Sequence, residues 1–95
     1  MATCNVSLQV LPFVSEEELF PVVDKAIEVI ANSGLAYIVG PLDTTIEGEL
    51  DELLEVVKQA QQACADAGAK RVVSIVKISY NSEGESMDGK IGKYR

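Results

Sequence analysis

The sequence predicts an α+β fold of the ferredoxin-like type, a βαββαβ plait with two helices on one face of a four-stranded antiparallel sheet. Two observations carry this prediction. Apolar residues recur with the periods of strand, helix, strand, strand, helix and strand, in that order. Neither a linker nor a break in composition divides the 95 residues. We therefore expect residues 1–95 to form one domain.

Alternating residues mark the first strand, from position 3 to position 11. Successive side chains of a strand face opposite ways, so this segment has one apolar face and one polar face. Pro12 cannot donate to a sheet ladder and should end the strand. The polar face carries Asn5, Ser7 and Gln9.

The first helix follows a start signal, Ser15 with Glu18 three residues later, which is typical of a capping box. Apolar residues then recur every three or four positions, as on a helix that buries one side. Gly34 suits the left-handed backbone conformation that ends many helices. We expect the buried stripe to contain Leu19, Val22, Val23, Ala26, Ile27 and Ile30.

Two short extended segments come next, at positions 35–40 and 42–47. Both are rich in residues that favour strands, and the pair Gly40-Pro41 marks a turn between them. They predict the two middle strands of the plait.

The second helix is predicted to begin where three acidic residues, Glu49, Asp51 and Glu52, complement the exposed amides of a first turn. Gly68 ends it. Its expected apolar stripe is Leu50, Leu53, Leu54, Val57, Ala60 and Cys64. Residues 71–80 predict the last strand, and we expect residues 81–95 to form a polar tail.

The charge balance excludes several classes of function. The chain has 8 basic and 15 acidic residues, a formal net charge of -7, and no histidine. A protein that binds nucleic-acid backbones needs a basic surface, so we expect no nucleic-acid partner. Catalysis by a serine–histidine or cysteine–histidine pair within one chain is excluded, and the sequence predicts no metal site and no cofactor. An acidic chain of this kind favours neutral or cationic ligands.

The sequence also predicts a cytoplasmic location. Its N-terminus lacks the basic and apolar regions of a signal peptide. No apolar run approaches the roughly 20 residues that span a bilayer, so we expect no membrane partner. Cys4 and Cys64 are expected to be buried, reduced thiols, since two cysteines alone make no disulfide framework.

The open face of the predicted sheet mixes polar and apolar residues. Beside the polar residues of the first strand it carries Val73, Ile75 and Lys77 from the last strand. A mixed face that no helix covers is commonly buried against another subunit. We therefore expect a homo-oligomer, in which a ligand site can be shared between subunits.

The densest group of polar side chains lies between Gly40 and Gly48. It combines two hydroxyls and two carboxylates beside a tight turn, which suits recognition of a small polar heterocycle. The same groups can instead satisfy the amides of the turn and favour the start of the next helix. The four residues are Asp43, Thr44, Thr45 and Glu47.

Three other residues have two interpretations each. Tyr37 offers a flat ligand a stacking surface, but it can equally pack at an interface. Asn5 and Ser7 can contact a ligand or lie at a hydrated subunit contact.

The segment from Ser33 to Glu49 resembles the signature of the YkoF-like family of thiamine- and hydroxymethylpyrimidine-binding proteins, in its single-plait type. The specific part is the string Gly40-Pro41-x-x-Thr44-Thr45-x-Glu47-Gly48. Similarity continues at residues 69–73 and 89–95, so the resemblance covers essentially the whole chain.

This resemblance implies a non-enzymatic protein that binds thiamine or its hydroxymethylpyrimidine moiety and sequesters or delivers it, assembled as a dimer of dimers. The implied ligand residues are Tyr37, Thr44, Thr45 and Glu47, with Asn5 and Ser7 as weaker candidates on the first strand. The alternative is an interaction or regulatory module whose open sheet face binds a protein partner. An enzyme built on the same polar cluster is a third hypothesis, disfavoured by the missing histidine.

Overall fold

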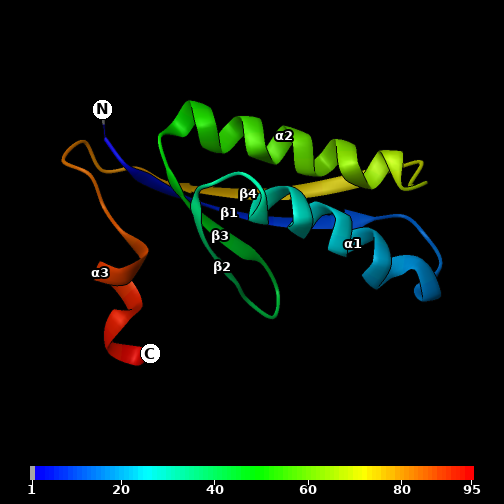
Figure 1. Ribbon diagram of the computed structural model, residues 1–95, viewed down its shortest axis with the longest axis horizontal. Coiled ribbons are helices and arrows are strands. Elements are labelled where there is room, and N and C mark those ends of the chain that lie inside the picture. The colour runs from blue at the N-terminus through cyan, green and yellow to red at the C-terminus, as the bar shows by residue number, and fades with distance from the viewer. Residues whose placement is uncertain (1) are drawn as a thin grey trace.

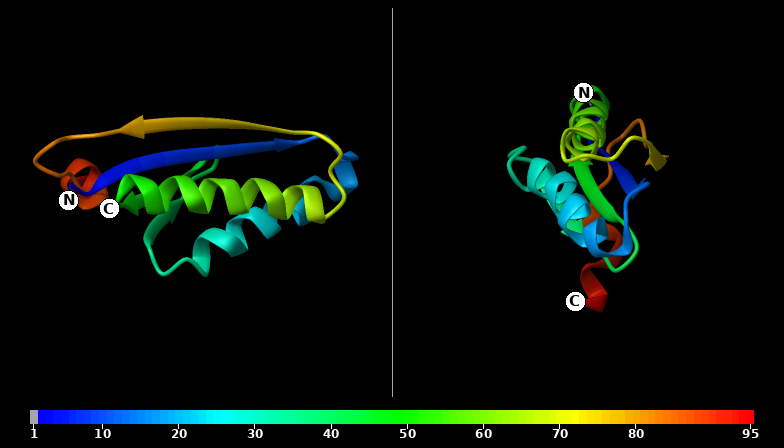
Figure 2. Two further views of the ribbon diagram at one scale, coloured as in Figure 1. Left: turned by 90° about the horizontal axis from the view of Figure 1, so that it is seen from above. Right: turned by 90° about the vertical axis from the view of Figure 1, so that its right-hand side faces the viewer.

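The structure is a computed structural model that describes residues 2–95, and it confirms the predicted plait. Four strands form one antiparallel sheet in the order β2-β3-β1-β4. Two long helices cover one of its faces (Figures 1 and 2). The elements are β1 (Cys4–Pro12), α1 (Glu16–Ala31), β2 (Ala36–Val39), β3 (Thr44–Gly48), α2 (Leu50–Asp66) and β4 (Val72–Ser79).

The hydrophobic core lies between the sheet and these two helices. Val6 on β1 lies opposite Ile46 on β3, and both side chains are fully buried. From α2, Leu53 and Val56 enter the core, whereas Leu54 of the predicted stripe is 41% exposed. Because the even-numbered residues of β1 and β3 face the helices, the odd-numbered ones form the opposite, open face.

The signals that delimit the first helix act as predicted. The Ser15 hydroxyl accepts a hydrogen bond from the Glu18 N–H at 3.3 Å, and α1 begins at Glu16. Gly34 has a φ of +82°, the left-handed conformation that residues other than glycine rarely adopt. This turn brings the chain from the end of α1 back into the sheet at β2.

The C-terminal region differs from the polar tail that we expected. It contains a short helix, α3 (Met87–Ile91), and a 3-10 turn, η1 (Gly92–Tyr94). The Ser86 hydroxyl accepts a hydrogen bond from the Gly89 N–H at 2.9 Å, and Met87 is buried. The prediction was wrong because a five-residue helix containing a glycine has neither the length nor the propensity to show a helical pattern. Tertiary contacts stabilise this segment instead.

These contacts return the C-terminal segment to the start of β1. The Glu85 N–H donates a hydrogen bond to the Thr3 carbonyl at 3.0 Å. The start of β1 and the C-terminal segment consequently lie at the same end of the molecule (Figure 1). Among residues 2–95, no helix has the length and apolar character needed to cross a membrane.

Candidate functional site

The strand register brings four of the six candidate site residues together on the open face. Asn5 lies opposite Glu47, and Ser7 lies opposite Thr45, on the adjacent strands β1 and β3. All four are at odd-numbered positions, so their side chains leave the sheet on the side that α1 and α2 do not cover. The open face thus gathers an amide, two hydroxyls and a carboxylate.

Tyr37 and Thr44 lie on the other face. Tyr37 is opposite Ile46, and Thr44 is opposite Leu8, and both of these partners point into the core. The six candidates therefore do not form one group. The signal was available in the sequence, because neighbours such as Thr44 and Thr45 on one strand must face opposite ways. A ligand contact by Tyr37 or Thr44 stays a prediction.

A pocket of about 450 Å³ opens on the face that carries Asn5, Ser7 and Thr45. Its volume falls within the roughly 300–1,000 Å³ of small-molecule sites. One part of its wall is the sheet and the other is α3. The remaining lining residues are Ile38, Lys77, Ile78, Ser79, Met87, Lys90 and Ile91.

The sequence analysis missed the wall that α3 provides. Met87, Lys90 and Ile91 come from the region interpreted as a tail, some 40 positions after the polar cluster. The one local signal was Ser86, whose hydroxyl caps the helix. That signal marks a possible helix start but does not indicate where the helix docks.

Glu47 connects the sheet to this wall. Its Oε1 accepts a hydrogen bond from the Met87 N–H at 2.6 Å. The carboxylate thereby satisfies a backbone donor at the first residue of α3, where negative charge is favourable. Glu47 stands beside the pocket and positions its wall, while Ser7 and Thr45 line the pocket itself.

Asn5 is the least satisfied polar residue of the site. Its side chain is 5% exposed, and neither Oδ1 nor Nδ2 has a hydrogen-bond partner among the described residues. Buried polar atoms are almost always paired, because an unpaired one loses its contacts with water without replacement. The Asn5 amide is therefore a donor and an acceptor without a partner among the described residues, in a residue that lines the pocket.

The charged residues that line the pocket are both lysines, Lys77 and Lys90. Lys90 Nζ lies 3.1 Å from Glu85 Oε2 and donates to the Ser79 hydroxyl at 3.2 Å. The Ser79 side chain, and then Lys90, hold the pKa of the Glu85 carboxyl below its ordinary value against the opposing effect of burial. Lys77 makes no ion pair within residues 2–95.

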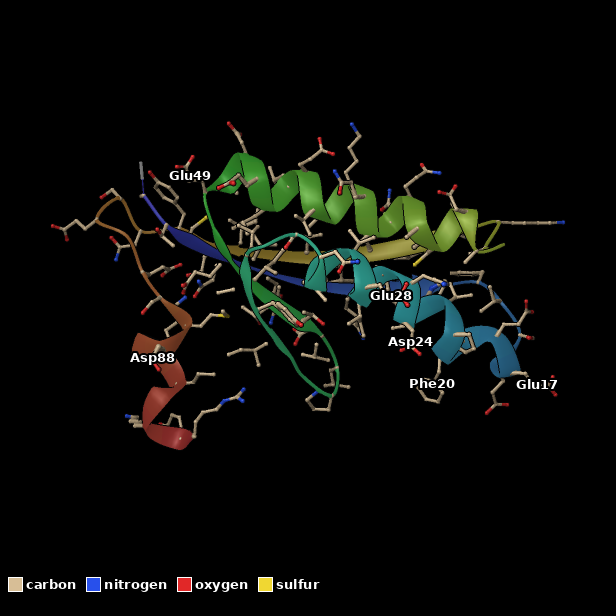
Figure 3. The ribbon with its side chains drawn as sticks, in the orientation of Figure 1. Glu17, Phe20, Asp24, Glu28, Glu49 and Asp88 are labelled. Atoms are coloured by element: carbon tan, nitrogen blue, oxygen red, sulfur yellow. The ribbon has the colours of Figure 1, made fainter. Side chains whose placement is uncertain are left out.

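The acidic excess of the chain lies elsewhere. The labelled carboxylates Glu17, Asp24 and Glu28 extend from the outer side of α1, and Glu49 stands at the start of α2 (Figure 3). The three on α1 are exposed. The overall charge of -7 therefore describes the helix surfaces and not the lining of the pocket.

The two cysteines are buried and unbonded, as expected. Burial raises the pKa of both thiols and is the main cause for Cys4 and the sole cause for Cys64. A raised pKa keeps a thiol protonated and unreactive at neutral pH. Within residues 2–95, no group of three or more acidic or cysteine residues is placed to hold a metal ion.

The fold and the site together define a class: a small ferredoxin-like plait with a pocket on its open sheet face, lined by both polar and apolar side chains. The chain belongs to the thiamine-binding protein family, whose model matches residues 6–95. It is 56% identical to a UPF0045 protein of Clostridium perfringens over the full length of both chains.

Solved structures of similar proteins have the same fold. A domain of unknown function from Bacillus cereus has a TM-score of 0.93 and 50% identity, covering 99% of this chain and 91% of that one. A protein of Thermotoga maritima, provisionally assigned to thiamine biosynthesis or salvage, has a TM-score of 0.91 and 39% identity. That comparison covers 98% of this chain and 99% of the other. The suspected family resemblance is thereby confirmed.

Proposed function

We propose that this protein binds thiamine or its hydroxymethylpyrimidine moiety and releases it unchanged, sequestering or delivering it in the cytoplasm. The observation that carries the proposal is the open-face pocket, which gathers the Asn5 amide with the Ser7 and Thr45 hydroxyls. Membership of the thiamine-binding family supports the choice of ligand. An aminopyrimidine offers an amine donor beside ring-nitrogen acceptors, and these groups match amide and hydroxyl partners.

The lysines favour one half of thiamine over the other. The thiazolium ring is cationic, and placing it beside Lys77, which makes no ion pair within residues 2–95, would bring like charges together, whereas the charge of Lys90 is balanced by Glu85. The neutral pyrimidine suffers no such repulsion. We therefore propose that the pyrimidine half enters the pocket while the thiazolium half stays outside it, toward solvent and the acidic surface of the molecule.

The proposed role is binding without catalysis. The chain has no histidine, and the pocket presents hydroxyls, an amide and lysines. The Ser79 hydroxyl of the pocket contacts the Glu85 carboxyl, but Glu85 is paired with Lys90 and its pKa is lowered, which makes it a weak general base. Such a lining can hold a heterocycle by hydrogen bonds and release it intact.

We further propose that the protein works as a homo-oligomer, a dimer of dimers. Within residues 2–95, strand β4 pairs with β1 alone, so this edge of the sheet is open. Ile75, Ile78 and Tyr80 near this edge are 47%, 50% and 61% exposed. An open edge with apolar side chains favours pairing with a second copy. Sedimentation of the wild type and of Ile78→Lys tests this: the variant should sediment as a smaller species.

The same exposed surface supports the second candidate, an interaction module that binds a protein partner through the open face. The two candidates differ in what they require of Thr45 and Lys77. If the protein is a partner-binding module, Lys77→Ala should change the assembly state measured by sedimentation. Thr45→Val should then leave the function intact.

A pair of neighbouring threonines provides the test of ligand binding. Thr45 lines the pocket, whereas Thr44 faces the core. Calorimetric titration with hydroxymethylpyrimidine should show binding by the wild type and by Thr44→Val. Thr45→Val should bind roughly 3- to 10-fold more weakly, the effect of one lost neutral hydrogen bond. Wild-type protein that gave neither heat nor thermal stabilisation with thiamine or hydroxymethylpyrimidine at millimolar concentration would contradict the proposed function.

A further inference from the structure

The side-chain amide of Asn5 is buried without a hydrogen-bond partner among the described residues, in a residue that lines the pocket. Its Oδ1 and Nδ2 are both buried without a partner. Each unpaired buried group costs the folded protein about 1–3 kcal/mol. Natural cores rarely retain such a residue, because an apolar side chain of similar size avoids the loss.

The polar side chains opposite Asn5 on the two neighbouring strands are already engaged in other hydrogen bonds. Glu47, opposite Asn5 on β3, accepts from the Met87 N–H. Ser79, opposite Asn5 on β4, accepts from Lys90. Two buried groups are without a partner among the described residues, the Asn5 amide and Glu85 Oε1, and of these two residues Asn5 is the one that lines the pocket.

We infer that Asn5 determines ligand specificity by binding an aromatic heterocycle that carries an exocyclic amine next to a ring-nitrogen acceptor. The amide Oδ1 accepts from the amine while Nδ2 donates to the ring nitrogen. An asparagine side chain makes the same two-bond pairing with the amine and ring nitrogen of adenine in DNA recognition. This inference rests on the proposed function and names the residue that selects the pyrimidine half.

The surroundings explain how the amide is kept from water until a ligand arrives. Met87 lines the same pocket as Asn5 and is 8% exposed. Met87 is unbranched and turns about three side-chain bonds, so it can withdraw without disturbing the sheet. An entering heterocycle would displace the Met87 side chain from the pocket to reach the amide.

The pairing rejects ligands by chemistry as well as by shape. A thiazolium ring has no adjacent donor and acceptor, so it would leave the amide unpaired. A pyrimidine whose amine is replaced by hydrogen keeps its size but loses the donor. An oxo analogue is less informative, because the amide can rotate by 180° and exchange its donor with its acceptor.

The test measures two ligands against three proteins. The ligands are hydroxymethylpyrimidine and its analogue without the amine, and the proteins are the wild type, Asn5→Leu and Gln9→Leu. Gln9 shares the strand and face of Asn5 but lies outside this pocket, so it is the matched control. Asn5→Asp is a second variant of nearly the same shape, which keeps the acceptors and loses the donor.

Calorimetry should show that the wild type and Gln9→Leu prefer hydroxymethylpyrimidine to the analogue by roughly 10- to 100-fold, the effect of a good two-bond pair. Asn5→Leu should lose this preference, and Asn5→Asp should reduce it. Circular dichroism establishes that each variant is folded. An Asn5→Leu protein that kept the preference, or a wild type that bound both ligands equally, would overturn the inference and leave the proposed function standing. A wild type that bound neither ligand would overturn both.

Discussion

The two faces of the sheet differ in how their buried side chains are satisfied. On the face that α1 and α2 cover, Val6 and Ile46 are fully buried among other apolar side chains. On the open face, the adjacent position Asn5 is also buried, yet its amide has no partner among the described residues. The covered face loses nothing by exclusion of water, whereas the open face retains polar groups at a loss of stability. Such a difference is expected where one face stabilises the fold and the other binds a ligand.

The largest expected effect lies on the covered face. Leu53 is fully buried in the core, so Leu53→Ala should lower the free energy of unfolding by about 2–5 kcal/mol through lost burial and the cavity left behind. Chemical denaturation followed by circular dichroism measures this change. Ser7→Ala on the open face should change stability by less than about 1 kcal/mol. Equal losses for the two variants would remove the distinction between the faces.

A smaller effect of opposite sign is expected at Asn5. Asn5→Leu replaces an unpaired buried amide with an apolar side chain, so it should raise the free energy of unfolding by about 1–2 kcal/mol in the absence of ligand. Thermal denaturation of the free protein checks this, with Gln9→Leu as the control. A variant that is less stable than the wild type would indicate that the amide contributes to folding and is not held for a ligand.

The smallest effect concerns pH and the attachment of α3. The folded state holds the pKa of Glu85 below its unfolded value, chiefly through Ser79 and then Lys90. A carboxyl with a lowered pKa contributes stability above its unfolded pKa, and this contribution is lost as the pH falls through the folded pKa. Acidification from about pH 6 to pH 3 should therefore loosen the C-terminal segment before the core.

Nuclear magnetic resonance can follow this loosening at the Met87 backbone amide, whose hydrogen bond to Glu47 reports the docking of α3. In Glu85→Gln, the part of the response that depends on Glu85 should disappear. A Met87 response identical in the two proteins would show that Glu85 does not contribute to the attachment.

Periodicity was sufficient for the elements that have a strong local pattern. The alternation in β1 correctly placed Asn5 and Ser7 on the polar face, and Ser15 marked the start of α1. These features depend on side chains a few positions apart, which interact whatever the rest of the chain does. The string around Thr44 and Thr45 identified the family. It also grouped the two threonines as ligand residues, although neighbouring residues of a strand face opposite sides of the sheet.

The sequence by itself determined the class of fold, the family and the polar character of one sheet face. Only the tertiary structure decided which polar residues share a pocket, because that depends on strand register and on a wall supplied by Met87 and Lys90 from a distant segment. It also decided which charges stand at the pocket, since lysines line it while much of the acidic excess lies on exposed helix surfaces. Composition sums charges over the whole chain, but a ligand responds to the few groups that the fold places beside it.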